Sequence, residues 1–450
     1  MLCRSSSLLL TCSLYLTVSA NLTEQVAAYP NNFNVLSMSI RGISNAIVPD
    51  DKWNKQDINT VYIGQKMAQY NYGIINVQED FNYHATLYKY DNHPFRTATS
   101  GGYLVGSGLN TLSNYSWIDF IRGFTFMRVR MDEGVYIDMI NLRVNDASTT
   151  GPDDQKARRL KIHQLADFIE TNSAGNAVIV FGDTGSRYTR CAPFLPSPIF
   201  LNFELGNSTS RGDNIRSFAA QNGLVDAWVQ AIGGDPPIAR AEPNVCPGGV
   251  PPNISCEVGD KVLYRGSPII DLKSTGFFYD TSRFLSPKEN LLTDHNPVRV
   301  EFGYLLKDGL RQSDLYGGPH GTWFNDLPSI SVDSKLTSIT LRGGNRLDGL
   351  TLTLASGQTF THGGSGGKAH SLNLTSGEYI ESVKLCWGQK DRHTRIFYSQ
   401  AIKNSGQDIQ VGKVTGNCAT ATAPSGYGVV GTYGQDGNEV DQLGFIYAQL

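Results

Sequence analysis

The run Ala177-Val178-Ile179-Val180-Phe181-Gly182-Asp183 is the clearest structural signal in this sequence of 450 residues. Five consecutive apolar residues followed by Gly and Asp are typical of a strand that is buried on both faces, as in the sheet of an α/β domain. A carboxylate directly after such a strand lies at the edge of the sheet, where ligands of α/β proteins commonly bind. We therefore expect Asp183 to belong to a functional site.

Short apolar runs of the same kind recur on both sides of this one, and helical stretches lie between them. The other predicted strands cover residues 35–40, 73–78, 124–131, 135–142 and 298–302. The best helix candidate covers residues 154–171, with an apolar face formed by Leu160, Ile162, Leu165, Phe168 and Ile169. This mixture predicts a layered α/β domain over residues 30–304.

The composition changes after residue 312. Gly, Ser and Thr become frequent, and apolar residues alternate with polar ones, as in Leu350-Thr351-Leu352-Thr353-Leu354. Alternation with period two and glycine-rich turns predict strands without intervening helices. Residues 313–450 are therefore expected to form a second, all-β domain.

The start of the chain predicts secretion. Residues 1–20 contain one basic residue, Arg4, an apolar stretch, and small residues at Val18-Ser19-Ala20, as in a signal peptide. Five Asn-x-Ser/Thr sequences fit the same route, since such sequences accept N-linked glycans in secreted proteins. They begin at Asn21, Asn114, Asn207, Asn253 and Asn373. The predicted protein is a secreted, extracellular glycoprotein.

The cysteines agree with an oxidising compartment. Removal of residues 1–20 leaves an odd number of cysteines, so at least one thiol is unpaired. Cys246 and Cys256 are spaced for a local loop bridge, and Cys386 with Cys418 would join two parts of the second domain, which leaves Cys191 free. No Cys-x-x-Cys pair indicates structural zinc.

The charge of the chain argues against general binding of polyanions. The formal net charge is −3 at pH 7, and basic residues do not form runs. Phosphate contacts with nucleic acids normally require a basic stripe. Composition therefore gives a nucleic-acid-binding function no support.

Polar residues follow several of the predicted strands. They occur in Asn76-Val77-Gln78-Glu79, in Val178 to Asp183, in Asp260-Lys261-Val262 and in Asp294-His295. Each motif is weak alone, because an acidic residue after a strand is more often structural. In this order, however, they resemble the metal-binding motif, the strand before GD-x-N, the D-[RK]-[IV] motif and the terminal SDH of the endonuclease/exonuclease/phosphatase superfamily, which includes deoxyribonuclease and neutral sphingomyelinases.

This resemblance implies a four-layer α/β sandwich and a phosphodiester hydrolase. Glu79 would hold Mg²⁺ or Mn²⁺, and a water molecule would attack phosphorus, so no nucleophilic Ser or Cys is required. His295 would act as the base, oriented by Asp260 or Asp294, because imidazole exchanges protons near neutral pH. Asp183 would orient the water or the phosphate.

Three positions depart from the family pattern. Arg143 stands where the family has His, Gly185 where it has Asn in GD-x-N, and Ser39 where the first strand ends in Asn. Arg143 keeps a fixed charge that suits phosphate but cannot exchange protons near neutral pH. The sequence therefore leaves open whether the domain is active or catalytically degenerate.

The second domain contains glycine-rich turns, among them Gly317-Gly318 and Gly437-Asn438-Glu439-Val440-Asp441. Glycines alone can simply permit tight turns. The last segment, however, is similar to the G-x-x-x-D sugar loop of jacalin-like lectins, which implies a β-prism. In such a site Asp441 accepts sugar hydroxyls, amides near residues 438–440 donate, and Gly318 lets the chain approach closely. The glycine loop 363–367 is a second candidate ligand surface.

Three hypotheses follow: a metal-dependent phosphodiesterase directed to glycans by a lectin domain, a lectin with an inactive phosphodiesterase-like domain, and a structural glycoprotein. Glu79, Asp260 and His295 favour the first hypothesis. Arg143 and Gly185 favour the second. The family acts on nucleic acids as well as lipids, so the resemblance gives the reaction class and leaves the substrate open.

Overall fold

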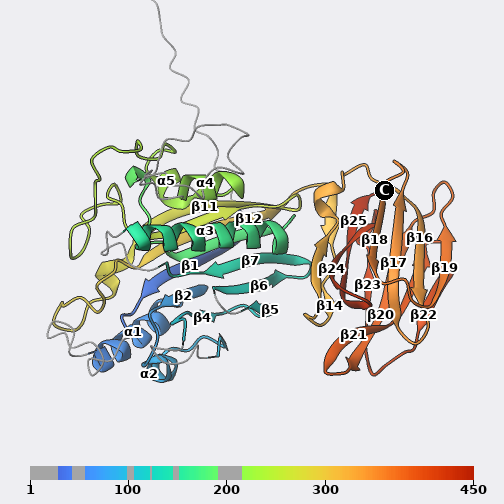
Figure 1. Ribbon diagram of the computed structural model, residues 1–450, viewed down its shortest axis with the longest axis horizontal. Helices are drawn as coiled ribbons and strands as arrows, with labels where there is room; N and C mark the ends of the chain where they lie inside the picture. Colours follow the sequence, from blue (N-terminus) through green and yellow to red (C-terminus); the bar gives the residue numbers. More distant parts are fainter. Residues whose placement is uncertain (1–28, 43–55, 99–105, 122–123, 145–151, 191–214) are drawn as a thin grey trace, which may run out of the picture.

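A computed structural model describes residues 29–42, 56–98, 106–121, 124–144, 152–190 and 215–450 of the chain (Figure 1). The predicted leader, residues 1–20, and Cys191 lie outside these ranges. None of the helices in the described ranges has the length and apolar character needed to span a membrane.

Two six-stranded sheets form the core of the N-terminal domain. The first sheet has the order β11 (Ile270–Tyr279), β12 (Val298–Leu306), β1 (Asn31–Ser39), β2 (Ile74–Gln78), β4 (Asn110–Ser113) and β3 (Phe95–Arg96). The second has the order β5 (Trp117–Ile121), β6 (Thr125–Asp132), β7 (Val135–Asn141), β8 (Ala177–Asp183), β10 (Asp260–Arg265) and β9 (Val225–Asp226). β1 is parallel to β2, and β7 is parallel to β8, so these four strands end at the same edge of the sandwich.

Helices cover both outer faces of the sandwich and give the four predicted layers (Figure 1). On one side lie α1 (Gln56–Tyr70) and α2 (His84–Tyr90), and on the other lie α3 (Pro152–Asn172), α4 (Ile215–Gln221) and α5 (Ala227–Ala231). Short 3-10 helices lie in the connections of the described residues: η2 (Tyr188–Arg190) and η4 (Asp280–Arg283) in this domain, and η5 (Leu327–Ser329) in the C-terminal domain. The predicted helix over residues 154–171 corresponds to α3. Ile162, Leu165 and Ile169 are buried, but Leu160 is exposed, so placing it on the apolar face was wrong.

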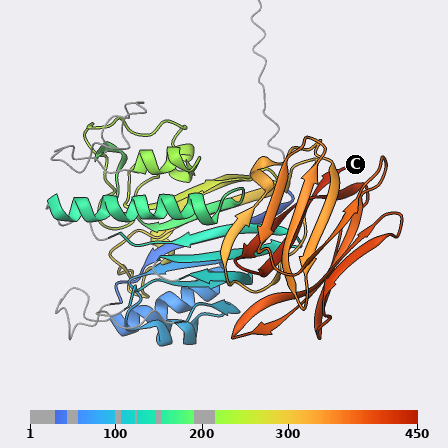
Figure 2. The same ribbon diagram turned by 45° about the vertical axis from the view of Figure 1, so that its right-hand side comes forward.

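The C-terminal domain consists of three sheets without α-helices, arranged as a prism, in its described residues 310–450 (Figure 2). One sheet contains β13 (Leu310–Gln312), β14 (Tyr316–Gly317), β15 (Thr322–Asn325), β24 (Tyr427–Asp436) and β25 (Val440–Gln449). The second contains β16 (Leu336–Gly343), β17 (Leu347–Leu354), β18 (Thr359–Gly363) and β19 (Lys368–Asn373), and the third contains β20 (Ile380–Lys390), β21 (His393–Lys403), β22 (Asp408–Gly412) and β23 (Asn417–Thr422).

Both predicted disulfides are present. One joins Cys246 to Cys256, and the other joins Cys386 to Cys418, which lie directly opposite each other on β20 and β23. Such bonds form in oxidising compartments, which agrees with an extracellular protein.

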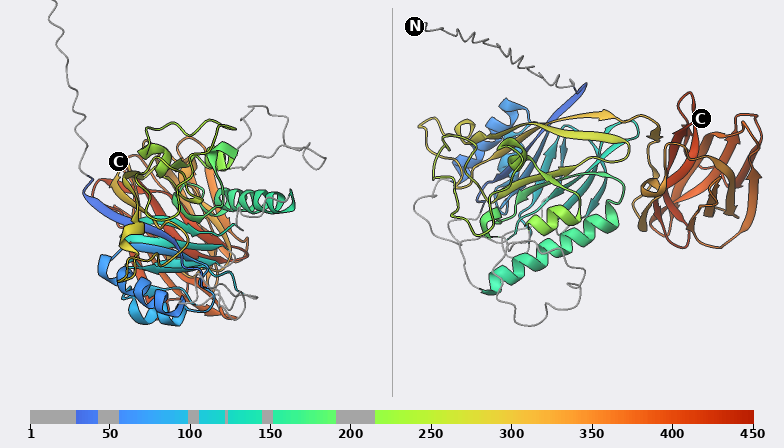
Figure 3. Two further views of the ribbon diagram at one scale, coloured as in Figure 1. Left: turned by 90° about the vertical axis from the view of Figure 1, so that its left-hand side faces the viewer. Right: turned by 90° about the horizontal axis from the view of Figure 1, so that it is seen from above.

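The two domains share a buried interface at one end of the sandwich (Figure 3). The Arg128 guanidinium is fully buried, bonds Asp138 at 2.8 and 3.0 Å and Asp119 at 3.0 Å, and lies 3.4 Å from the ring centroid of Trp323 in the C-terminal domain. A cation stacked on an aromatic ring away from water is strongly held. From the C-terminal domain, Gln435 also donates to Asp119 at 3.3 Å.

A second set of interface contacts surrounds Asp314. Its carboxylate accepts two hydrogen bonds from Arg130, at 2.9 and 2.8 Å, one from the Gly134 amide at 2.9 Å and one from the Tyr136 hydroxyl at 3.0 Å. Gly134 and Tyr136 lie at the start of β7. The C-terminal domain therefore packs on the end of the sandwich where β7 begins, and the edge where β7 ends lies away from it (Figure 1).

Candidate functional site

The strands of the first sheet become polar toward the edge away from the interface. Alternation along β1 turns Val35 toward the second sheet and Leu36 toward α1 and α2, as their membership of two different apolar clusters shows. The same alternation puts Ser37 on the inner side, where Val35 lies, and its hydroxyl contacts Asp260 of the second sheet. On β2, Ile74 is followed by Asn76 and Gln78 on the inner side, and both are fully buried. A polar inner surface therefore begins where the strands approach their ends.

Asp183 and Asp260 face each other at this edge. They end β8 and begin β10, and they are direct partners in the antiparallel pairing of the two strands. Both are almost completely buried. With His295 they form a group whose ligand atoms all lie within 4.8 Å of one another. The structure thus brings together three of the four residues that were predicted to be catalytic.

Asp260 holds His295 in place. Its Oδ2 lies 3.3 Å from His295 Nδ1, and its Oδ1 accepts a hydrogen bond of 3.3 Å from Ser37. Burial opposes protonation of the ring, but the hydrogen bond to Asp260 and the charges of Asp260, Asp183 and Asp294 outweigh it and raise the pKa of His295 to about 10. In the metal-free site this pKa keeps the ring protonated at neutral pH. A cation bound by Asp183 and Asp260 would offset their charges and lower the pKa of His295 toward the range that the expected base requires.

Asp183 is poorly neutralised. Burial and the nearby charge of Asp260 raise its pKa to about 6, although His295, the Gly185 amide and Arg143 act in the opposite direction. The Gly185 amide donates to Asp183 Oδ1 at 2.9 Å. Gly185 has a φ of +57°, in the left-handed region, where Asn is the best tolerated residue after Gly. The family's Asn would have to adopt this left-handed backbone, at a cost that is smaller for Asn than for other side chains.

Glu79 and Asp294 lie outside this group and pair with arginines. The Glu79 carboxylate forms an ion pair with Arg143, whose backbone bridges to that of Asp183. Asp294 pairs with Arg41 at 2.8 Å, and its side chain is 31% exposed. The guanidinium of Arg143 thus contacts the carboxylate that was predicted to hold the metal.

Sequence reasoning missed a buried hydrogen-bonded chain that leads to Asp260. The Gln78 amide donates to Asn141 at 2.9 Å, and Gln78 Oε1 lies 3.5 Å from the Ser37 hydroxyl that contacts Asp260. Asn141 in turn donates to the Asn110 carbonyl at 3.0 Å. The alternation of side chains along β1 and β2 could have indicated this chain, because it puts Ser37 and Gln78 on the inner side of the sheet.

Asp80 lies at the far end of that chain. Its Oδ2 accepts a hydrogen bond of 2.7 Å from the Asn110 side chain, whereas its Oδ1 is buried without a partner. Burial raises the pKa of Asp80 to about 7, although the bond from Asn110 opposes the change. Asp80 is thus a further carboxyl group with too few donors. Ser39, where the family has Asn, also has a buried hydroxyl without a partner.

The residues at the edge fit a divalent cation. Mg²⁺ and Mn²⁺ prefer oxygen ligands, and Asp183 and Asp260 supply carboxylates that face each other. Burial, and after it the charge of Asp260, raise the pKa of Asp183, so the neighbouring groups do not fully compensate its negative charge. A cation bound between the two carboxylates would compensate their charge. Glu79 would join such a site only after release from Arg143.

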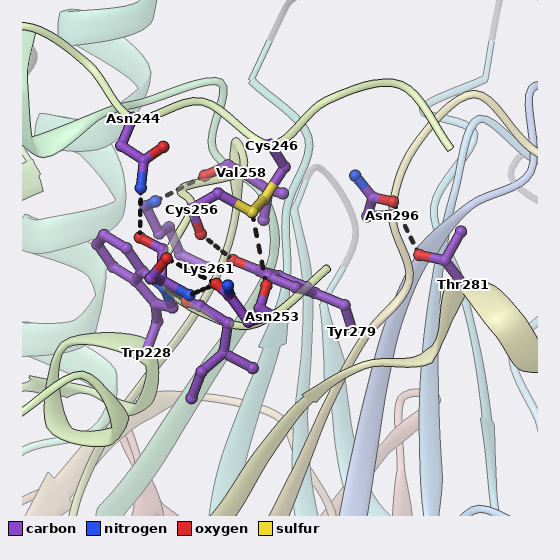
Figure 4. Close-up of a disulfide and its surroundings, with 12 residues drawn as sticks. Trp228, Asn244, Cys246, Asn253, Cys256, Val258, Lys261, Tyr279, Thr281 and Asn296 are labelled. Atoms are coloured by element: carbon purple, nitrogen blue, oxygen red, sulfur yellow. Dashed lines mark hydrogen bonds between the residues drawn. A yellow bond between two sulfur atoms is a disulfide. The ribbon is translucent and has the colours of Figure 1, made fainter. Parts of the chain in front are cut away.

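The start of β10 is fixed by the disulfide loop before it. Figure 4 shows the bond between Cys246 and Cys256, with Lys261 and Tyr279 nearby. The Tyr279 hydroxyl donates to the Cys256 carbonyl at 2.6 Å. The buried ammonium of Lys261 donates to Glu257 at 2.8 Å and to the Val258 carbonyl at 2.6 Å. These contacts hold the residues on both sides of Asp260.

The segment Gly437–Asp441, here called the sugar loop, connects β24 to β25. Gly318 donates its amide to the Asp441 carbonyl at 3.1 Å, and a Cβ at Gly318 would lie 2.5 Å from Cβ of Thr394. The close approach that Gly318 permits is thus an approach to β21. The glycine loop 363–367, the second candidate ligand surface, adjoins the sugar loop, since a Cβ at Gly364 would lie 2.3 Å from the Asn438 carbonyl oxygen.

Both carboxylates of the sugar loop are engaged by basic side chains. Glu439 accepts two hydrogen bonds from Arg346, at 2.8 and 2.6 Å, and one from Lys390 at 3.3 Å. Arg395 lies 3.5 Å from Glu439 and also forms an ion pair with Asp441. Val440 is buried in the start of β25. The bond from Arg346 contributes most to lowering the pKa of Glu439.

Comparison with known proteins identifies both halves of the chain. The model of Endonuclease/Exonuclease/phosphatase family 2 matches residues 24–198, and the model of the jacalin-like lectin domain matches residues 313–446. Among solved structures, Malaysian banana lectin is 21% identical, covers 32% of this chain and 100% of its own, and has a TM-score of 0.29. A mannose-binding jacalin-related lectin from Ananas comosus is 26% identical, with the same coverage and a TM-score of 0.28.

Curated relatives match up to 61% of the chain. Sphingomyelinases of Mycobacterium bovis and Mycobacterium tuberculosis are each 30% identical over 302 residues, which is 61% of this chain and 53% of theirs. The chain thus spans about half the length of these relatives. A secreted RxLR effector protein 19 of Plasmopara viticola is 25% identical over 150 residues, covering 32% of this chain and 83% of that protein. This chain joins an endonuclease/exonuclease/phosphatase family 2 domain, similar to sphingomyelinases, to a C-terminal jacalin-like lectin domain.

Proposed function

We propose that the N-terminal domain is a metal-dependent phosphodiester hydrolase and that the lectin domain directs it to glycans outside the cell. The meeting of Asp183, Asp260 and His295 at one edge of the sandwich is the observation that carries the proposal. The names of the mycobacterial relatives make sphingomyelin the first substrate to test. Two disulfides and the similarity to a secreted effector support the extracellular location.

The reaction breaks a phosphorus–oxygen bond of the diester as water attacks phosphorus. Mg²⁺ or Mn²⁺, held by Asp183 and Asp260 and joined by Glu79 once this carboxylate leaves Arg143, would supply neutralisation of charge on the phosphoryl group and a water molecule of lowered pKa. Asp183 orients the water or the phosphate. His295, positioned by Asp260, gives a proton to the leaving oxygen, and the proton that the attacking water loses restores His295.

The alternative is a lectin whose phosphodiesterase-like domain is inactive. The ion pair between Arg143 and Glu79 favours it, because a guanidinium on the predicted metal ligand competes with the metal. Gly185 favours it too, since it offers only a backbone amide where the family has an Asn side chain. The two functions differ in a measurable quantity, the hydrolysis rate.

Hydrolysis of sphingomyelin in mixed micelles and of bis(p-nitrophenyl) phosphate by the purified full chain distinguishes the two functions. We expect hydrolysis with Mg²⁺ or Mn²⁺, no hydrolysis with EDTA, and loss of activity in Glu79→Ala and Asp183→Asn. Thermal melting of each variant controls for folding. Activity that survives both the chelator and Glu79→Ala would exclude the metal mechanism. No hydrolysis of either substrate, with glycan binding intact, would favour the inactive alternative.

A further inference from the structure

The basic side chains around the sugar loop are more exposed than its carboxylates. Lys390 is 42% exposed and Arg395 is 23% exposed, whereas Glu439 is 14% exposed and Asp441 only 3% exposed. The carboxylates are turned inward, and the cations lie between them and the solvent. A ligand that approaches the loop therefore meets ammonium and guanidinium groups first.

Asp441 has little capacity left for a neutral sugar. Its Oδ1 is paired with Arg395, and its Oδ2 lies 2.7 Å from the position that a Cβ on Gly321 would take, so the chain closes over that oxygen. Two sugar hydroxyls would have to displace a guanidinium from a buried carboxylate. Leaving a buried charge unpaired costs more than a hydrogen bond to a neutral hydroxyl returns.

Three cations are the direct partners of the two loop carboxylates. Arg346, Lys390 and Arg395 form ion pairs with Glu439 and Asp441, and Lys390 is the most exposed of the three. The hydrogen bond to Glu439 first, and with it the charges of Asp348 and Asp391, raise the pKa of Arg346, which leaves Lys390 and Arg395 as the cations turned most toward the solvent. Burial first, and then the charges of His393 and Arg395, lower the pKa of the nearby His320.

We propose that the sugar loop binds acidic glycans, with a carboxylate or sulfate group of the sugar held by Arg395 and Lys390. The Nη2 group of Arg395 can donate to such a group, while the contacts of Nε with Glu439 and of Nη1 with Asp441 and the Thr394 carbonyl keep the guanidinium oriented. Lys390 adds a mobile point charge at the rim. This inference rests on the proposed glycan-binding function and specifies its ligand class.

Calorimetry with the full chain tests the inference, using matched pairs of oligosaccharides: sialyllactose and sulfated lactose against lactose, and a glucuronate-containing disaccharide against its neutral analogue. We expect at least tenfold tighter binding of the acidic member of each pair, with affinity falling as NaCl increases. The carboxylated and the sulfated probes separate the two kinds of acid. Arg395→Gln should lose at least tenfold, and Lys390→Gln a smaller factor.

Controls separate binding from folding. Arg395→Gln combined with Asp441→Asn removes both members of the buried ion pair and should fold while still losing acidic glycans. Lys335→Gln is the matched control, because Lys335 contacts the Gln449 carbonyl near the opposite end of β25 and should have no effect. Preferred binding of neutral sugars, strengthened by Arg395→Gln, would overturn the inference and leave the glycan function intact. No binding of any probe by the wild type would overturn both.

Discussion

Both candidate sites of the molecule combine carboxylates with basic side chains. Carboxylates outnumber the basic side chains at the edge of the sandwich, whereas basic side chains outnumber the carboxylates at the sugar loop. At the edge of the sandwich, Asp183 and Asp260 share one protonated imidazole, and the pKa of Asp183 is raised. At the sugar loop, Glu439 and Asp441 share three cations, and the pKa of Glu439 is lowered. A buried carboxylate with too few hydrogen-bond donors attracts a cation or a proton. Where basic side chains outnumber the carboxylates, some of their N–H groups remain available to an anionic ligand. The balance of charge, more than the residue types, separates a metal site from a site for an acidic ligand.

Removing the imidazole from the acid-rich site has the largest expected effect. His295→Asn deletes the proton donor and leaves Asp183 facing Asp260 without a cation. We expect the hydrolysis rate to fall by roughly two to four orders of magnitude, the usual contribution of a positioned acid or base. His163→Gln, at an exposed position on α3, is the control and should keep the wild-type rate. A fall of less than tenfold in His295→Asn would show that the Asp–His pair is not the chemical centre.

Asp80 is a second buried carboxyl group with too few hydrogen-bond donors, and its effect can be measured as a change in the free energy of unfolding. The folded protein keeps the Asp80 carboxyl protonated up to about pH 7, whereas an unfolded carboxyl has its ordinary pKa of 3.8, so the wild type loses stability as pH rises between these two values. Asp80→Asn has no proton to lose and can still accept the bond from Asn110. In EDTA, urea unfolding should show equal stability near pH 3.5 and a variant more stable by up to roughly 4 kcal/mol at pH 8. Equal stabilities at both pH values would contradict the raised pKa.

Restoring the family residues has the smallest expected effect. Arg143→His together with Gly185→Asn frees Glu79 from its guanidinium and adds a side-chain donor beside Asp183. If the domain is impaired, turnover with Mg²⁺ should rise by about tenfold or more. Residue 185 has a left-handed φ, which costs Asn less than other residues that carry a side chain, and thermal melting of the double variant is the control for folding. A fast wild-type enzyme that the double variant does not improve would show that Arg143 serves catalysis as it stands.

The sequence predicted the layers because period and burial are local properties. The apolar run before Asp183 and the helical spacing of Ile162, Leu165 and Ile169 each depend on neighbours in the chain. The prediction for Leu160 was wrong because the width of an apolar face depends on what packs against it, and the described residues around Leu160 leave it exposed. The meeting of Asp183, Asp260 and His295 followed from the order of the family motifs.

The ion pairs of both sites were beyond sequence reasoning. Arg143 reaches Glu79, and Arg395 reaches Asp441, only because of strand order and register, which the local pattern does not encode. The glycine pattern likewise indicated the sugar loop without showing which side chains would flank it. Prediction therefore located the two sites and missed the charge balance that distinguishes them.

The interface around Arg128 limits how this pair of domains can be exchanged during evolution. A lectin domain joined by a free linker can be replaced by any other, but here Trp323 covers a buried guanidinium, and Asp314 is bonded by three residues of the partner domain. A foreign module attached after residue 306 would leave Arg128, Asp119 and Asp138 exposed to water at the end of the sandwich. The hydrolase-like and lectin domains are thus expected to be inherited together, and related chains that lack the lectin domain should carry a different residue at the position of Arg128.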